Sequence, residues 1–206
     1  MNPLDPLALG ALRGQAPRIH TFALSQLVQV LRGACPARVL EEARQASNTR
    51  RPQTSSQGKG TSPRSMALEA VLARFPEDYR TLLRPRLELH FPQALVRGQL
   101  DGLLVGRGEA VGLKWVGRTS PKRDALEALG FCLHNFAQRN GLRPRLLLIR
   151  PHRVLSYSLA PVGSPAYRRT AEALQRAVVV LRRGVRVGGR WCRGCPLRHG
   201  CPARAL

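Results

Sequence analysis

The sequence predicts an α/β protein in which a mixed central sheet is flanked by helices. Apolar segments with strand-like alternation cluster in the middle of the chain, and segments with helical periodicity precede, separate and follow them. The chain has 206 residues, of which 43% are hydrophobic, and this is enough for one domain with its own core. We therefore expect a single domain over residues 1–206.

Each expected element depends on a local pattern. Ser25 is a suitable helix N-cap, and the apolar residues that follow it recur at helical spacing until Gly33. Residues 46–63 are polar, basic and rich in Ser, Thr and Gly, so we expect a flexible loop there. The expected helices are 25–32, one from 36 onward, 65–75, 124–140 and 171–181. The expected strands are 87–91, two within 94–116, 145–149 and 154–159.

The segment from Ala94 to Val116 predicts an antiparallel hairpin, because two apolar runs flank the turn signal Gly106-Arg107-Gly108. Asp101 lies on its first strand and Lys114 on its second, so pairing would bring an acid and an ammonium group to one edge of the sheet. Such a pair suits metal-assisted phosphodiester hydrolysis, with the acid on a divalent cation and the ammonium beside the attacking water. The alternative is that Asp101 caps a turn and Lys114 extends from an edge strand.

The use of lysine favours the functional interpretation of this pair. Only three of the 34 basic residues are lysines, so a lysine within an apolar strand indicates a need for a compact ammonium group.

The charge of the chain points to a polyanionic partner. The sequence has 34 basic and 12 acidic residues, which gives a formal charge of +22. A field of this size attracts nucleic acid through the release of counterions. Codon composition explains part of the arginine excess, since Ala, Gly, Pro and Leu are also abundant, but it does not explain the scarcity of acids.

The sequence also indicates a compartment. No apolar run approaches the length of a membrane span, and the first residues lack the pattern of a signal peptide, so we expect no membrane association and a cytoplasmic protein. Five cysteines in a reducing compartment indicate metal or redox chemistry before disulfides.

Three of the cysteines form a C-x2-C-x5-C motif near the C-terminus, namely Cys192, Cys195 and Cys201. Cysteines three positions apart on a tight loop can direct two thiolates at one metal, and the surrounding arginines favour the thiolate form. A metal site of this kind requires a fourth ligand.

The candidates for the fourth ligand are Cys35, His199 and Cys132. Cys132 lies in an expected helix among apolar residues, so we expect it in the core. His199 would complete a zinc site. Cys35 is the stronger candidate, because a proline follows it directly, as prolines also follow Cys195 and Cys201. Such Cys-Pro pairs are common at iron–sulfur ligands.

Several motifs together resemble one family. Residues 25–40 (SQLVQVLRGACPARVL) resemble an S-x-L-(x)n-C-P-x-(R/K) opening segment, Gly98-Gln99-Leu100-Asp101 resembles a G-x-(apolar)-D motif, and Gly112-Leu113-Lys114 stands in the place of (D/E)-x-K. With the C-terminal C-x2-C-x5-C, this set resembles the RecB-like nucleases that carry an iron–sulfur cluster, such as the CRISPR-associated RecB-type exonucleases and AddB. The resemblance covers nearly the whole chain.

The resemblance implies a PD-(D/E)XK restriction-endonuclease-like core, in which a cluster joins the N-terminal and C-terminal segments. It implies Mg or Mn at the active site if the protein is active, with Asp101 and the upstream acid Glu88 as metal ligands and Lys114 beside the attacking water. The second acid of the family is replaced by Gly112, and we expect Glu109, three residues earlier, to substitute for it from the turn if the strand register allows. The implied ligands of the 4Fe–4S cluster are Cys35, Cys192, Cys195 and Cys201.

The chain departs from the family pattern at the active site. Gly112 stands where the family has its second acid, and Ser65 stands where it has a histidine. Glu127 and Phe131 occupy the places of Gln and Tyr in a Q-L-x-x-Y helix. We therefore expect a weakened active site, to which Gly112→Glu would restore activity.

Three functional hypotheses follow. The first is a metal-dependent exonuclease or endonuclease that processes single-stranded or end-frayed DNA. The second is a catalytically inactive nuclease-like module that binds DNA and serves a helicase, repair, recombination or CRISPR partner. The third is a small zinc-stabilised nucleic-acid-binding protein that uses His199.

Overall fold

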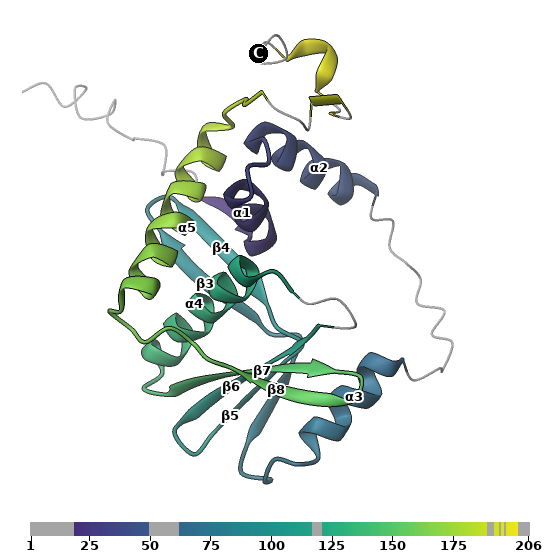
Figure 1. Ribbon diagram of the computed structural model, residues 1–206, viewed down its shortest axis with the longest axis vertical. Helices are drawn as coiled ribbons and strands as arrows, with labels where there is room; N and C mark the ends of the chain where they lie inside the picture. The colour runs from purple at the N-terminus through teal and green to yellow at the C-terminus, as the bar shows by residue number, and fades with distance from the viewer. Residues whose placement is uncertain are drawn as a thin grey trace, which may run out of the picture.

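The computed structural model describes residues 19–49, 62–116, 121–188, 192–193, 195 and 197–201. In this part of the chain, five α-helices and two β-sheets build an α/β fold (Figure 1). The helices are α1 (Leu24–Leu31), α2 (Pro36–Thr49), α3 (Pro63–Leu72), α4 (Arg123–Arg139) and α5 (Pro165–Arg183). The strands are β1 (His20–Ala23), β2 (Arg80–Leu83), β3 (Arg86–Phe91), β4 (Ala94–Gln99), β5 (Gly102–Gly106), β6 (Glu109–Trp115), β7 (Arg143–Arg150) and β8 (Arg153–Tyr157). The predicted α/β class is confirmed.

The strands form two mixed sheets instead of the single central sheet that we expected. The smaller sheet has the order β1-β4-β3, with β1 parallel to β4, and the larger has the order β2-β5-β6-β7-β8, with β6 parallel to β7. The segment 94–116 is therefore not one hairpin, because β4 lies in the smaller sheet and β5 in the larger.

The chain passes between the sheets at two adjacent places. The Leu100 N–H donates to the Pro85 carbonyl at 3.2 Å, and the Arg84 N–H donates to the Asp101 carbonyl at 3.0 Å. Arg84 has a φ of 49°, and Pro85 has no N–H for a ladder. These two residues interrupt regular pairing, and Asp101 consequently lies at the junction of the sheets.

The predicted turn between β5 and β6 is confirmed. Gly106 pairs with Glu109 in an antiparallel register, and the two residues between them, Arg107 and Gly108, have φ values of 49° and 71°. Positive φ at both central residues is typical of the two-residue turns that match the twist of a hairpin.

Helices cover both faces of the larger sheet (Figure 1). On β7, Leu146 and Leu148 belong to the core that α4 covers, whereas Leu147 and Ile149 belong to the cluster under α3. Because side chains alternate along a strand, an uninterrupted apolar run is what a strand buried on both faces requires. Helices α1 and α5 pack beside α4 over the smaller sheet.

The loop expected at 46–63 is only partly tested. Residues 46–49 are the last residues of α2 and α3 begins at Pro63, whereas residues 50–61 lie outside the described residues. Helix α5 begins before the predicted residue 171, because the Ser164 hydroxyl caps it by accepting the Tyr167 N–H at 3.2 Å. No helix in the described ranges combines the length and the apolarity that a membrane crossing requires.

Candidate active site and candidate metal centre

Asp101 and Lys114 meet at the junction of the two sheets. The Lys114 Nζ lies 3.7 Å from Asp101 Oδ2, and the Trp115 N–H donates to the same oxygen at 2.6 Å. The Asp101 N–H donates to the Leu113 carbonyl at 2.9 Å, which fixes the carboxylate beside the end of β6. The side chain of Asp101 is 4% exposed and that of Lys114 is 34% exposed. The structure thus brings this predicted pair together.

A third charged residue joins the pair, and the sequence motifs had not indicated it. Arg64, in the first turn of α3, donates from Nη2 to Asp101 Oδ1. Ser62 caps this helix by accepting the Ser65 N–H at 3.2 Å, and Pro63 is its first residue. No local pattern relates Arg64 to Asp101, which lies 37 positions further along the chain.

Two hollows adjoin this group. The larger, which we call the basic cleft, has a volume of about 810 Å³ and lies between α1, α4 and the end of β4. Its charged lining residues are Arg32, Arg86, Arg97 and Lys114. The smaller, which we call the α3 pocket, has a volume of about 200 Å³ and is lined by Arg64, Ser65, Glu69, Arg84 and Asp101 among others.

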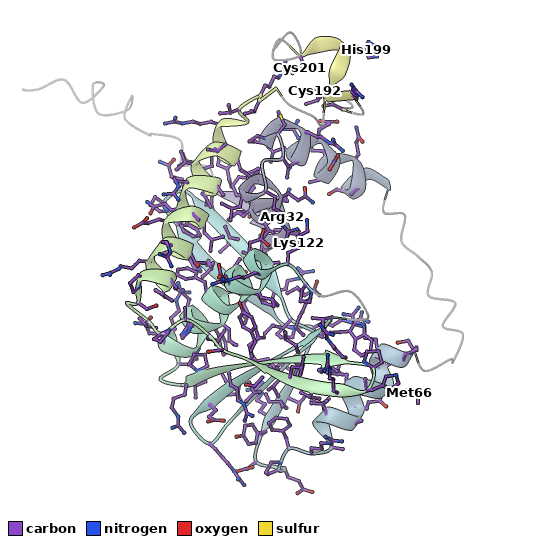
Figure 2. All side chains as sticks on the ribbon, in the orientation of Figure 1. Arg32, Met66, Lys122, Cys192, His199 and Cys201 are labelled. Carbon is purple, nitrogen blue, oxygen red and sulfur yellow. The ribbon has the colours of Figure 1, made fainter. Side chains whose placement is uncertain are left out.

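The cations of the basic cleft differ in their partners. Arg32 binds Asp124 with two hydrogen bonds of 2.5 and 2.7 Å at the beginning of α4, near the labelled Lys122 (Figure 2). The guanidinium holds the pKa of Asp124 below its ordinary value. Among the described residues, Arg86 has no ion-pair partner. Its charge is therefore available to a ligand.

The structure does not bring the other predicted acids to Asp101. Glu109 begins β6, five positions before Lys114, and lies 3.6 Å from the Arg143 guanidinium. Glu88 pairs with Arg97 at 2.9 Å on the smaller sheet. We had expected Glu109 to substitute for the missing acid from the turn. The strand register does not allow this, because Glu109 and Lys114 lie toward opposite ends of β6.

Gly112 does share a strand face with Lys114, but at a different depth. A Cβ on Gly112 would lie 3.0 Å from Leu133 Cδ2 and 3.1 Å from Leu100 Cδ1. Position 112 therefore faces the leucines under α4, and only Lys114 reaches the basic cleft. The expectation that Gly112→Glu supplies a metal ligand does not agree with this packing.

The remaining motif positions have other contacts. Ser65, in the place of the family histidine, donates from its hydroxyl to the Ser62 carbonyl at 3.1 Å. Glu127 pairs with Arg123 at 2.7 Å, and Phe131 packs on Tyr167 with ring centroids 4.9 Å apart. Glu127 and Phe131 line a separate hollow of about 240 Å³, of which neither Asp101 nor Lys114 is a lining residue.

The four predicted cysteine ligands lie around one small hollow at the other end of the molecule. Cys35 precedes α2, and the C-terminal segment that carries the other three lies beside it (Figure 2). The Val187 N–H donates to Cys35 Sγ at 3.4 Å across 152 positions of sequence, and Arg186 donates to the Gly200 carbonyl at 2.8 Å. The hollow is lined by Cys35, Cys192, Cys195 and Cys201, with Arg38, Arg186, Val187 and Leu197.

The donor chemistry of this hollow fits a thiolate-bound metal. Four sulfur ligands are typical of an iron–sulfur cluster or a structural zinc ion. The volume inside the cysteine hollow is about 10 Å³, close to what one water needs. A four-iron cluster would therefore require the C-terminal segment to move outward. Within the described residues, no three His, Cys, Asp or Glu side chains are arranged so that they could hold a metal ion together.

The other two candidates for the fourth ligand lie elsewhere. His199 is exposed and does not line the hollow. Cys132 is fully buried in the core, as predicted, and burial raises the pKa of its thiol to about 12. Cys132 is not a lining residue of the cysteine hollow, so it is not placed to act as the fourth ligand there.

Comparisons with known proteins do not identify the function of the chain. No family model and no curated protein sequence matches the chain. The crystal structure of SSO0001 superimposes with a TM-score of 0.48 at 18% identity, over 92% of this chain and 89% of that one. A structure described as a "Putative exonuclease" from Eubacterium rectale superimposes with a TM-score of 0.37 at 12% identity, over 85% of this chain and 72% of that one.

Proposed function

We propose that this protein binds DNA in its basic cleft and that it is a protein of the iron–sulfur RecB-like nuclease type. The observation that carries the proposal is the composition of the cleft. Four cations line it and none of its lining residues is a carboxylate, in a chain whose formal charge is +22. A concave, positively charged surface concentrates the field on a phosphate backbone. The proposed ligand is single-stranded or end-frayed DNA, delivered by a helicase, repair, recombination or CRISPR partner.

Binding to DNA should depend steeply on salt and on Arg86. Three of the four cations already pair with carboxylates of the chain, namely Arg32 with Asp124, Arg97 with Glu88 and Lys114 with Asp101. If all four nevertheless contact a phosphate of a single strand, the slope of log affinity against log salt is about −3. Arg86→Gln should reduce the magnitude of this slope by about 0.7, because it removes one such contact. Fluorescence anisotropy with a labelled single-stranded oligonucleotide measures both quantities.

The matched control is Arg168→Gln, which removes an exposed arginine from α5 outside the cleft. This variant should keep the wild-type slope. Equal losses in the two variants, or heparin that competes as well as DNA at equal charge, would mean that the whole basic surface binds polyanions without a dedicated cleft.

Metal-dependent phosphodiester hydrolysis is the second candidate function. It is favoured by the α3 pocket, in which Glu69 and Asp101 are both lining residues and Lys114 lies beside Asp101. A divalent cation prefers several oxygen ligands, which these two carboxylates and a phosphate could supply only after Arg64 leaves Asp101.

We expect the protein to bind DNA without cutting it in Mg or Mn. A gel assay with single-stranded and frayed substrates, with Asp101→Ala as the control, separates the two candidate functions. Cleavage that disappears in Asp101→Ala would assign hydrolysis to this site, and its loss in Glu69→Gln as well would identify the second ligand. Intact substrate, together with binding, assigns a catalytically inactive DNA-binding module.

We further propose that Cys35, Cys192, Cys195 and Cys201 hold a 4Fe–4S cluster, with a zinc ion as the alternative. The shared hollow supports this ligand set over one that contains His199. When bound, the group would link the beginning of α2 to the C-terminal segment. Because the unfolded chain has no such site, the binding free energy would contribute directly to folding.

A further inference from the structure

The carboxylate of Asp101 has both oxygens engaged. Oδ1 accepts from the Arg64 guanidinium, and Oδ2 accepts from the Trp115 N–H at 2.6 Å and faces the Lys114 ammonium at 3.7 Å. The side chain is 4% exposed. A divalent cation could reach this carboxylate only by displacing a positively charged side chain that already binds it.

The charge of this group favours an anion over a cation. One carboxylate stands between two cations, so the three side chains carry a net charge of +1. Among the described residues, Glu69 and Arg84 also line the α3 pocket, and their charges cancel. A divalent cation would meet net repulsion here, and a phosphate would meet net attraction.

The two cations have donors left for a ligand. A guanidinium carries five N–H donors and an ammonium carries three. Lys114 directs one donor to the Gln99 carbonyl at 3.4 Å, and Arg64 uses Nη2 on Asp101. Their side chains are 34% and 50% exposed, so the remaining donors face solvent where the basic cleft and the α3 pocket approach each other.

We propose that Arg64 takes the place of the catalytic cation and that Arg64 and Lys114 form a metal-independent clamp for a backbone phosphate of DNA. Asp101 is the positioning residue of this clamp: its buried charge orients both cations, and it binds no metal. The proposal rests on the proposed DNA binding and specifies one of its contacts. The bidentate geometry of arginine suits two oxygens of a phosphodiester, and the ammonium adds a point charge.

The first experiment measures affinity for a single-stranded oligonucleotide across salt concentrations, in EDTA and in Mg. Wild-type affinity should be no higher in Mg than in EDTA. Arg64→Gln and Lys114→Gln should each lower the magnitude of the salt slope by about 0.7, whereas Arg74→Gln, an exposed arginine just beyond α3, should leave it unchanged. Circular dichroism melts establish that each variant is folded.

The second experiment titrates Mn into the protein without DNA and follows the free ion by electron paramagnetic resonance. We expect no Asp101-dependent Mn binding in the wild type, so Asp101→Asn should leave the titration unchanged. We expect Arg64→Ala to gain an Mn site that depends on Asp101. Stoichiometric Mn on the wild type that is lost in Asp101→Asn would overturn the clamp and show that a cation fits.

The outcomes separate this inference from the proposed function. If Arg86→Gln lowers the magnitude of the salt slope but Arg64→Gln leaves it unchanged, the clamp is wrong and DNA binding in the basic cleft stands. If the wild type does not bind DNA at low salt, both are wrong.

Discussion

Gly112→Glu is expected to unfold much of the protein and to give no nuclease activity. A Cβ at this position would already lie 3.0 Å from Leu133 and 3.1 Å from Leu100, so the rest of a glutamate side chain has no room without displacing the core. The carboxylate would also be buried among leucines without a partner. Burial of an unpaired polar group costs roughly 2–7 kcal/mol, and a charged group costs more, which is comparable to the whole stability of a domain.

Chemical denaturation with matched variants checks this expectation and its cause. Gly112→Ala adds only the Cβ and should cost about 1–3 kcal/mol through overpacking. Gly112→Gln has the size of glutamate without its charge, so the difference between Gln and Glu isolates the cost of the charge. A Gly112→Glu protein that is as stable as the wild type and cleaves DNA in Mg would show that position 112 opens to the active site.

Loss of the proposed metal group from the cysteine hollow should destabilise the whole domain. Cys35 precedes Cys192 by more than 150 positions in the sequence. It also precedes Val187 by more than 150 positions, although the two residues are hydrogen-bonded. Closing a loop of this length destabilises the unfolded chain by about 5 kcal/mol through lost entropy, by analogy with a disulfide. Cys35→Ala should therefore lower the Tm of the entire cooperative transition and abolish the bound metal.

Metal analysis of anaerobically purified protein decides which group is present. Iron and sulfide in equal amounts support the 4Fe–4S cluster, and one zinc without iron supports the alternative. Cys132→Ala is the control, because it removes a buried thiol from the core and should leave the metal content unchanged. Loss of metal in His199→Ala but not in Cys35→Ala would contradict the proposed ligand set.

Local patterns were sufficient wherever the deciding contacts are local. The Gly106-Arg107-Gly108 segment indicated the turn between β5 and β6, and the positive φ that such a two-residue turn requires falls on Arg107 and Gly108. The approach of Lys114 to Asp101 followed from that turn, although Asp101 lies in the link between β4 and β5 instead of within a strand. The apolar neighbours of Cys132 likewise indicated a core residue.

The repeated Cys-Pro pairs concern a spatial relation over a long distance along the chain. They predicted that Cys35 would lie with the C-terminal cysteines, and the four line one hollow. The metal itself remains a prediction, since a set of thiols suits both iron–sulfur clusters and zinc.

The sequence by itself determined the α/β class, the order of most elements and which residues share a strand face. Only the tertiary structure decided that the strands divide into two sheets at Arg84 and Pro85, that Arg64 binds Asp101, and that Glu109 lies at the far end of β6. The physical reason is that alternation along a strand specifies the face of a residue but not its depth under a helix. Gly112 and Lys114 share a face, yet α4 covers Gly112 and leaves Lys114 at the basic cleft. Which residue a helix covers depends on the packing of elements far apart in the chain.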